Sequence, residues 1–358
     1  MSSEKIGVGI IGTGWGLRIH GKGLSNCDSA RIVGICGANE EKTQGAAADL
    51  GGVEAYTDYR RLLDRNDLDA VVVASPDDLH HSIVIDAIDR GKHVFCEKPL
   101  ARSVADSRDM WQRAESASVV HMTAFSFYWM PHIQYFKQLI DEGYVGNPKA
   151  LSMRYHQGFK LNTDEYRWRS DATRSDGTIA DLGAHCFFAS RWLMGAINEI
   201  HASLRIYIDK PPLNDRQVGS SNDAAFVNLG FESGVHGSIS ISQASLSLDI
   251  FELEVAGDKG TLSLQASDNI IIRGIRLDGN GPETLDIPVK MAEAYGEAKT
   301  SLEIFVNSLT NGRGGVGSFV QAIVEETPGF PSFKEGHQAQ QIIDASIRSD
   351  ESSTVVKL

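Results

Sequence analysis

The sequence is poor in cysteine and has no long apolar run, and each shortage excludes a class of protein. Only 4 of its 358 residues are cysteine, they are scattered, and no two form a CxxC pair, so we expect no disulfide framework. No apolar run approaches the roughly 20 residues that a membrane-spanning helix needs. The opening MSSEKIGVGIIG lacks the basic start and apolar core of a signal peptide, which predicts a cytoplasmic protein.

Basic residues are also scarce relative to acidic ones. The chain has 34 Lys and Arg against 47 Asp and Glu, a formal net charge of −13. Because this charge repels phosphate backbones and anionic lipid, we expect neither nucleic acid nor a membrane as a partner. The length exceeds the ~100–200 residues of a typical domain, so two domains are expected.

Strand-like and helix-like segments alternate over the first third of the chain. Apolar, β-branched runs occupy residues 5–11, 31–36, 69–74, 92–96 and 119–124, and helix-like stretches lie between them at 40–50, 78–90 and 103–117. This rhythm predicts a parallel sheet with helices on both faces. We therefore expect a doubly wound α/β domain of about six strands over residues 1–125.

The rhythm changes after residue 125. A helix is predicted at 131–142, a strand at 149–156 and a helix at 178–194, and strand-like runs then follow one another from 197 to 275, divided by turn signals such as GDKG. Helices are predicted again at 297–311 and 335–349. We expect an α+β domain over 126–358 with an open, mostly antiparallel sheet, whose open face another subunit could cover.

A glycine-rich turn follows the first strand in GIIGTGWGLRIH, residues 9–20. Gly12 and Gly14 can form a tight turn whose backbone N–H groups approach a pyrophosphate. The usual third glycine is missing at Leu17, and Gly16 comes one residue early. The turn predicts a dinucleotide site that also includes Thr13 and Trp15, although Trp15 could equally pack in the core.

The end of the second strand bears on which dinucleotide is bound. An acid usually binds the ribose 2′-hydroxyl of NAD at this place, but here the strand ends in Cys36-Gly37-Ala38-Asn39. Without a carboxylate the site at Gly37 can admit a 2′-phosphate, to which Asn39 or Lys42 could bond. No arginine is present to hold that phosphate. We expect NADP or NAD, with NADP favoured.

Three separated motifs carry a resemblance to a known family. AVVVASPDDLHHSIVIDAIDRGKHVFCEKPLA, with its EKP at 97–99, resembles the glucose–fructose oxidoreductase, inositol 2-dehydrogenase and rhizopine-catabolism (Gfo/Idh/MocA) family, as do Trp168-Arg169 and DGTIADLGAH at 176–185. The resemblance implies a Rossmann domain, a second domain with an open antiparallel sheet, and an active site between them. It also implies chemistry on a secondary hydroxyl or ketone of sugars and cyclitols, and homodimers or homotetramers formed through the open sheet.

The resemblance also assigns residues to roles. Lys98 matches the family's catalytic lysine, Asp181 and His185 match its aspartate and histidine, and the cofactor-side loop is matched by Ser75, Pro76 and His80. His80, at the start of a predicted helix, could equally be a loop or packing residue. The chain departs from the pattern at Leu17, at Asp77, where asparagine is common, and at Tyr128-Trp129, where an arginine often stands.

The chemistry of a secondary alcohol explains why such residues are needed. Removal of a hydride requires that the hydroxyl proton also leaves, so a base must reach that oxygen. Lys98 follows a parallel strand at the end where open α/β sheets bind ligands, and its ammonium form can return the proton in the reverse direction. Glu97 is expected to hold Lys98 or to contact the nicotinamide ribose, unless it forms only a surface ion pair.

Asp181 and His185 are spaced to project from one face of a helix. They could relay the proton or bind a neighbouring hydroxyl, or they could be a helix-start acid and a core histidine. A metal would need a third ligand, so none is expected. Further substrate contacts are predicted among aromatic and polar residues that could equally be packing residues: Tyr128, Trp129, His156, Tyr166, Trp168 and Arg169.

Three functions are compatible with these motifs. The first is an NAD(P)-dependent oxidoreductase acting on a sugar or polyol. The alternative is an NAD-dependent glycosidase or deglycosylase that oxidises its sugar transiently and eliminates the aglycone. The third is a cofactor-sensing regulatory protein, against which the intact Lys98, Asp181 and His185 argue.

Overall fold

The computed structural model describes residues 5–161, 168–208, 219–248 and 250–358. Tyr166 lies outside these residues. The chain separates by packing into two compact units, one formed by Met1–Trp129 with Phe305–His337 and the other by Met130–Ile304 with Gln338–Leu358. The sequence predicted one boundary, at residue 125, whereas Phe305–His337 also pack in the first unit. Local sequence could not indicate this, because the packing joins residues that are far apart along the chain.

The first unit contains a parallel sheet of six strands in the order β3-β2-β1-β4-β5-β6. This confirms the doubly wound fold. The strands are β1 (Ile6–Ile11), β2 (Ala30–Cys36), β3 (Glu54–Tyr56), β4 (Ala70–Val73), β5 (His93–Cys96) and β6 (His121–Thr123). The order reverses between β1 and β4, so the carboxyl ends of these two strands and of β5 adjoin where such sheets bind ligands.

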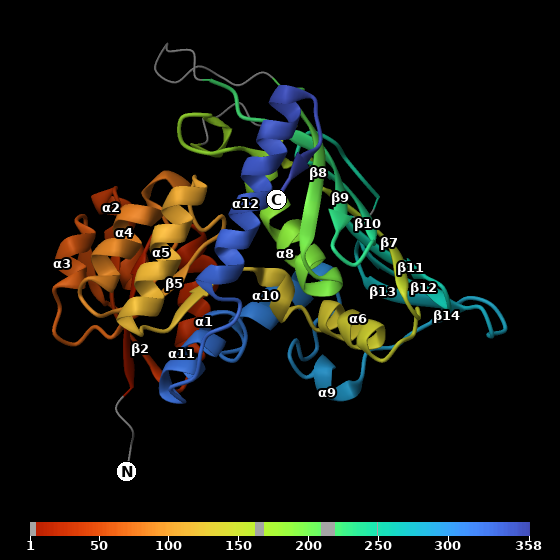
Figure 1. Cartoon of the computed structure of the whole chain (residues 1–358). Helices are drawn as coiled ribbons and strands as arrows, with labels where there is room; N and C mark the ends of the chain where they lie inside the picture. The colour runs from red at the N-terminus through yellow and green to blue at the C-terminus, as the bar shows by residue number, and fades with distance from the viewer. Residues whose placement is uncertain (1–4, 162–167, 209–218, 249) are drawn as a thin grey trace. The chain divides into compact units, whose positions relative to one another are not determined.

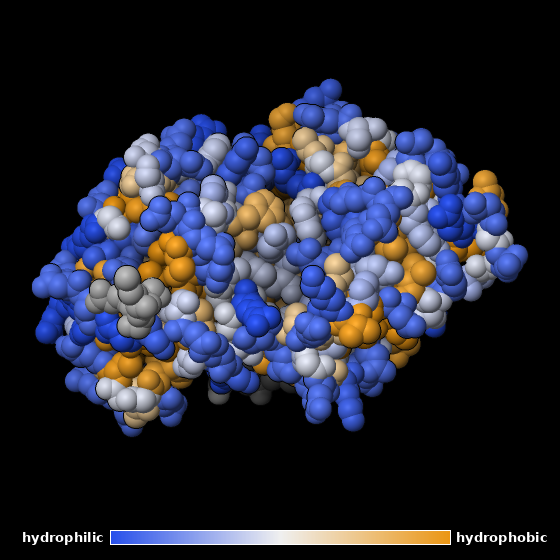
Figure 2. Space-filling view, turned by 90° about the horizontal axis from the view of Figure 1, so that it is seen from below, coloured by the Kyte–Doolittle hydropathy of each residue, from blue (hydrophilic) through white to orange (hydrophobic). Residues whose placement is uncertain are grey.

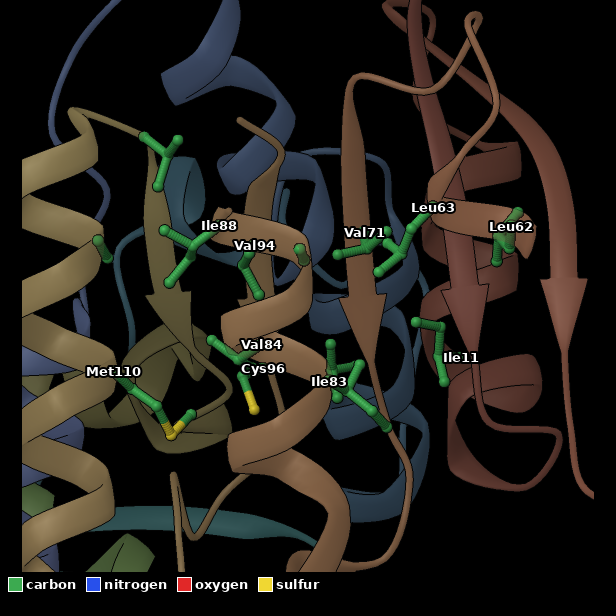
Figure 3. Close-up of a cluster of buried hydrophobic side chains, with 14 of the residues drawn as sticks. Ile11, Leu62, Leu63, Val71, Ile83, Val84, Ile88, Val94, Cys96 and Met110 are labelled. Atoms are coloured by element: carbon green, nitrogen blue, oxygen red, sulfur yellow. The ribbon is translucent and has the colours of Figure 1, made fainter. Parts of the chain in front are cut away.

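Helices cover both faces of this sheet (Figure 1). They are η1 (Gly16–Gly21), α1 (Lys22–Ser25), α2 (Glu40–Asp49), α3 (Tyr59–Leu63), η2 (Asp77–Leu79), α4 (His80–Ile88), α5 (Val104–Ala117), η3 (Ser126–Trp129) and α11 (Val316–Val324). Alternate strand residues face opposite sides, which divides the core into two clusters. Figure 3 shows one of them, where Ile83, Val84 and Ile88 of α4 lie against Val94 and Cys96 of β5.

The second unit is built on a sheet of nine strands in the order β14-β13-β12-β11-β7-β10-β9-β8-β15. All pairs are antiparallel except the parallel pair of β7 and β10 at its centre, so the expected mostly antiparallel sheet is confirmed. The strands are β7 (Pro148–His156), β8 (Ile197–Arg205), β9 (Ala224–Phe231), β10 (His236–Ser242), β11 (Phe251–Gly257), β12 (Gly260–Ala266), β13 (Ile270–Arg276), β14 (Glu283–Thr284) and β15 (Val356–Lys357).

One face of this second sheet is apolar and the other polar. The apolar face includes Met153 and Ile241 and contacts α8, since Ser190 of that helix reaches the Met153 sulfur. The opposite face exposes Asn228, Ser238 and Glu254. The remaining helices are α6 (Pro131–Asp141), η4 (Gly158–Lys160), η5 (Trp168–Ser170), α7 (Thr178–Asp181), α8 (Gly183–Met194), α9 (Val289–Ala292), α10 (Ser301–Thr310) and α12 (Phe333–Ser352).

Figure 2 shows a face on which hydrophilic residues predominate and hydrophobic ones form scattered patches. Among the described residues, no helix is both long enough and apolar enough to span a membrane.

Candidate functional site

The glycine turn lies at the carboxyl end of β1. Gly12 has a φ of +129°, and a Cβ there would come within 2.3 Å of the Ala74 carbonyl oxygen, so only glycine fits. A Cβ on Gly14 would meet no atom within 4 Å. The backbone of the turn is therefore open at Gly14, as a ligand lying against main-chain N–H groups requires. Trp15 is 44% exposed beside it, with its ring 6.3 Å from that of Phe305.

Gly16 explains how the turn works without a glycine at position 17. The chain enters η1 as a π-helix, which has more residues per turn than an α-helix. Gly16 is buried, and a Cβ there would lie 3.0 Å from Ala74 Cβ and 3.3 Å from Ile10 Cγ2. The close contact of helix and strand that the third glycine usually allows is therefore made one residue earlier, and Leu17 packs against the core.

The end of β2 is more crowded than the sequence suggested. A Cβ on Gly37 would lie 2.6 Å from Thr13 Cγ2 and 2.7 Å from Thr43 Oγ1, so this glycine serves close packing. Asn39 caps α2, its side chain accepting a hydrogen bond from the Lys42 backbone N–H at 2.8 Å. Glu40 and Glu41 occupy the exposed first turn of α2. Two carboxylates thus follow β2 closely, a few residues after the position where NAD-binding sites usually have the acid that binds the ribose.

The loop after β4 contains Ser75 and Pro76 and leads into η2 and α4. His80, the first residue of α4, has no exposed surface. Its Nδ1 lies 2.9 Å from the Pro99 carbonyl oxygen and its Nε2 lies 3.0 Å from the Ser75 carbonyl oxygen. His80 therefore joins the loop after β4 to the loop after β5.

The EKP segment begins where β5 ends. The Glu97 backbone N–H donates to the Val73 carbonyl oxygen at 2.8 Å, which ties the segment to β4. The Glu97 side chain accepts from the Lys98 backbone N–H at 3.2 Å through Oε2 and from His20 Nε2 at 2.8 Å through Oε1. Lys98 is half-buried, and its peptide bond to Pro99 is cis.

The acids at this edge influence a neighbouring thiol. Burial raises the pKa of Cys96, and the Glu97 and Asp77 carboxylates raise it further. Because the thiolate form is thereby disfavoured, Cys96 is a packing residue and not a nucleophile. Sequence reasoning missed His20, although it stands at the end of the quoted glycine motif, because nothing local indicates that its partner is Glu97.

Asp181 lies in the second unit within a polar network. Gln243 Nε2 donates to Asp181 Oδ2 at 2.6 Å, and Gln243 Oε1 accepts from Thr178 Oγ1 at 2.8 Å. Arg169 Nε lies 3.6 Å from Asp181 Oδ1. Burial raises the pKa of Tyr155, and the Asp181 carboxylate is one of the nearby groups that raise it further. Gln243 could not be found from local sequence, because it follows β10, 62 residues from Asp181.

His185 is buried in α8, beyond a break in the predicted helix. The single helix expected at 178–194 is two helices, α7 and α8, separated by Leu182. Gly183, which is a poor helix former, begins α8 and fits closely there: a Cβ on it would lie 3.2 Å from Ile241 Cδ1. Asp181 thus ends one helix and His185 belongs to the next.

The structure brings some of the other predicted substrate contacts close to Asp181. The Arg169 guanidinium lies 4.3 Å from the Trp168 ring centroid, so the Trp-Arg motif and Asp181 are brought together. His156 accompanies Ser240 on the polar face of the sheet, with Nε2 2.8 Å from its hydroxyl, whereas Tyr155 is on the apolar face. His156 therefore lies on the face of the sheet opposite Tyr155, the residue whose pKa the Asp181 carboxylate raises. Tyr128 lies in η3 of the first unit, with its ring 4.9 Å from that of Phe330.

The first unit therefore gathers its predicted residues at one edge of a sheet. The glycine turn, the Ser75 loop and Lys98 follow β1, β4 and β5, which are neighbours in the sheet. The open turn at Gly14, together with the buried contact of Gly16 behind it, fits a dinucleotide whose pyrophosphate lies against the backbone.

Comparisons with known proteins agree with this arrangement. Residues 6–125 match the model of the oxidoreductase family with an NAD-binding Rossmann fold, and residues 133–263 match the GFO/IDH/MocA C-terminal domain. The chain is 30% identical over 257 residues to myo-inositol 2-dehydrogenase of Thermotoga maritima, covering 71% of this chain and 74% of that protein. It is 27% identical over 349 residues to levoglucosan dehydrogenase of Pseudarthrobacter phenanthrenivorans, covering 88% of this chain and 86% of the relative.

Solved structures give the same result. A levoglucosan dehydrogenase in complex with NADH and L-sorbose superposes with a TM-score of 0.89 at 25% identity, over 99% of each chain. With both halves matched in order and full-length likeness in structure, the chain belongs to the Gfo/Idh/MocA family of oxidoreductases, whose N-terminal part is an NAD-binding Rossmann fold.

Proposed function

We propose that this protein is an NAD-dependent dehydrogenase or reductase acting on a secondary hydroxyl or ketone of a sugar or cyclitol, with Lys98 as the group that transfers the substrate proton. The placement of Lys98 carries the proposal. It follows β5 at the edge of the sheet that also holds the glycine turn, and its backbone is bonded to Glu97. The named activities of the relatives, on myo-inositol and levoglucosan, support the substrate class.

The chemistry divides between the bound nicotinamide and this chain. When bound, the nicotinamide accepts a hydride from the alcohol carbon or returns one to the ketone. Lys98 takes the hydroxyl proton in the oxidative direction and donates it to the carbonyl oxygen in the reductive one. The bond from the Lys98 backbone to Glu97 limits the movement of the main chain that carries the amine.

We propose that Asp181 and His185 bind hydroxyl groups of the substrate. Asp181 is oriented by Gln243 and has Arg169 nearby, so its carboxylate is held in one position where it can accept from a hydroxyl. Trp168, stacked under Arg169, offers an apolar surface of the kind that sugar rings contact. His156 is left out, because it bonds Ser240 on the opposite face of the sheet.

We propose NAD as the preferred cofactor, in place of the NADP that the strand end suggested. Asn39 accepts from the Lys42 backbone, so its side-chain oxygen serves as a helix cap. The carboxylates of Glu40 and Glu41 follow in the first turn of α2. Like charges repel, so these two acids oppose a 2′-phosphate and do not hinder a 2′-hydroxyl.

A coupled screen tests the proposal. The purified chain is mixed with a panel of sugars, cyclitols and aryl glycosides in the presence of NAD, NADH, NADP or NADPH, and both nicotinamide absorbance and aglycone release are followed. The expected result is net oxidation or reduction of the cofactor with a sugar or cyclitol, faster with NAD or NADH. Release of aglycone without net change in the cofactor would overturn the proposal in favour of a glycosidase that regenerates its NAD.

A further inference from the structure

His80 makes two hydrogen bonds that a neutral imidazole cannot make together. Its Nδ1 is 2.9 Å from the Pro99 carbonyl oxygen and its Nε2 is 3.0 Å from the Ser75 carbonyl oxygen. Carbonyl oxygens only accept, and a neutral histidine has one N–H. The ring has no exposed surface, so water cannot replace either partner. Both bonds form only when both ring nitrogens carry a proton.

The two carbonyl oxygens belong to different loops, which follow β4 and β5 at the same end of the sheet as the glycine turn. Ser75 follows β4, while Pro99 follows β5 and is the residue directly after Lys98. We propose that His80 is a buried imidazolium that clamps these two loops together and is thereby a positioning residue for Lys98. The role in positioning rests on the proposed function of Lys98, whereas the protonation of the ring does not.

A buried cation needs charge of opposite sign nearby. Asp77, three residues earlier, is buried in the turn that leads into α4, and its backbone carbonyl accepts a hydrogen bond from the His80 backbone N–H. Titratable side chains of both signs belong to α4, to the elements packed against it or to the segment that follows β5: Tyr59, Arg60, Arg61, Asp78, His81, Asp86, His93, Cys96, Glu97, Lys98, Asp106, Arg108, Asp109, Arg113 and Glu115.

The protonation state can be measured directly. The full-length chain is labelled with ¹⁵N-histidine, and ring nitrogens are observed by NMR at about pH 8, above the ordinary histidine pKa of ~6.5. The His80 signals are assigned by their loss in His80→Gln, or in His80→Asn where the first variant does not fold. Two protonated ring nitrogens are expected. A single N–H, as in a neutral tautomer, would overturn the proposal.

A second experiment tests the link to Lys98. Single variants His80→Gln and Lys98→Ala and their double variant are compared with the fastest substrate of the screen, and NADH affinity is measured by fluorescence. His80→Gln should lower kcat roughly 10- to 100-fold, as small misplacements of a reacting group do. In the Lys98→Ala background it should cause no further loss, because its effect acts through Lys98.

The adjacent residue supplies a matched control. His81 is on the same helix but only partly buried, with Nε2 2.9 Å from Asp109 Oδ2, so His81→Gln should leave kcat unchanged. An equal loss from His80→Gln with and without Lys98 would contradict the positioning role. If Lys98→Ala alone retained full activity, the proposed function of Lys98 would fail, and the NMR result on His80 would still stand or fall independently.

Discussion

His20 Nε2 lies 2.8 Å from Glu97 Oε1, although 77 residues separate them. Both side chains are nearly buried, with 6% and 13% of their surface exposed. The other Glu97 oxygen accepts from the Lys98 backbone, so both carboxylate oxygens are engaged. The helix after the glycine turn is thus bonded to the segment that carries Lys98.

Loss of this bond should destabilise the first unit. His20→Leu removes the donor and leaves the Glu97 carboxylate without this partner in a nearly buried place, which should cost about 1–3 kcal/mol. Denaturant unfolding of His20→Leu, Glu97→Gln and the double variant measures the coupling between the two side chains. Additive effects would show that the bond contributes nothing to stability.

Lys98→Ala tests the proton transfer itself. We expect a loss of at least ~10²-fold in kcat, typical of a missing general base, with little change in NADH affinity. Steady-state kinetics and fluorescence titration separate the two quantities. Lys92→Ala, at a residue whose amine bonds the Leu68 carbonyl oxygen before β5 begins, is the control and should retain activity. An unchanged rate in Lys98→Ala would remove Lys98 from the mechanism.

Substitutions at two glycines of the turn should have different effects, one on NADH affinity and the other on the stability of the first unit. Gly14→Ala adds a methyl group in open space, so stability should change by no more than about 0.5 kcal/mol. NADH affinity should fall roughly tenfold, because the methyl group occupies the approach of the pyrophosphate. Gly16→Val should instead destabilise the unit by about 1–3 kcal/mol by overpacking Ala74 and Ile10. Thermal unfolding and NADH titration of both variants check this contrast.

Charge at the start of α2 should set the preference between cofactors. Reversing Glu40 and Glu41 to lysine should favour NADP, by about 1 kcal/mol, or roughly fivefold, for each charge near the 2′-phosphate. The ratio of kcat/KM for NAD and NADP is the measurement. Asp49→Lys, at the exposed far end of the same helix, is the matched control. Equal ratios in the reversed and control variants would exclude these acids as determinants.

His132 should make the second unit sensitive to acid. It is buried at the start of α6, stacked 5.6 Å from the Tyr295 ring, and among the described residues its Nδ1 has no hydrogen-bond partner. Burial lowers its pKa from 6.5 to about 4. The unfolded chain therefore binds the proton more readily, so stability is full above pH 6.5 and falls as the pH drops towards 4.

The loss attributable to this histidine is up to about 3 kcal/mol, since one pKa unit corresponds to ~1.4 kcal/mol. His132→Phe keeps an aromatic ring against Tyr295 and cannot titrate, so its Tm should fall less between these pH values. His201→Phe, at an exposed position of β8, should retain the wild-type slope. Parallel slopes for His132→Phe and the wild type would contradict this assignment.

The sequence predicted those parts of the fold that local patterns report. The five apolar runs of the first unit are all strands, and the glycine turn and EKP segment follow the strands as expected. Short elements escaped notice: β3 has three residues and α3 five, too few to show a period. α11 was also missed, although Val316, Phe319 and Val320 pack into the core of the first unit.

The sequence by itself determined the family, the parallel sheet and the identity of Lys98 as a candidate, because periodicity and short motifs record which residues are buried and which turns form. Only the tertiary structure decided that Gly16 replaces a glycine at position 17, that His20 meets Glu97, and that His80 spans two loops. Each of these depends on atoms brought together across tens of residues by packing, and local sequence does not encode such distances.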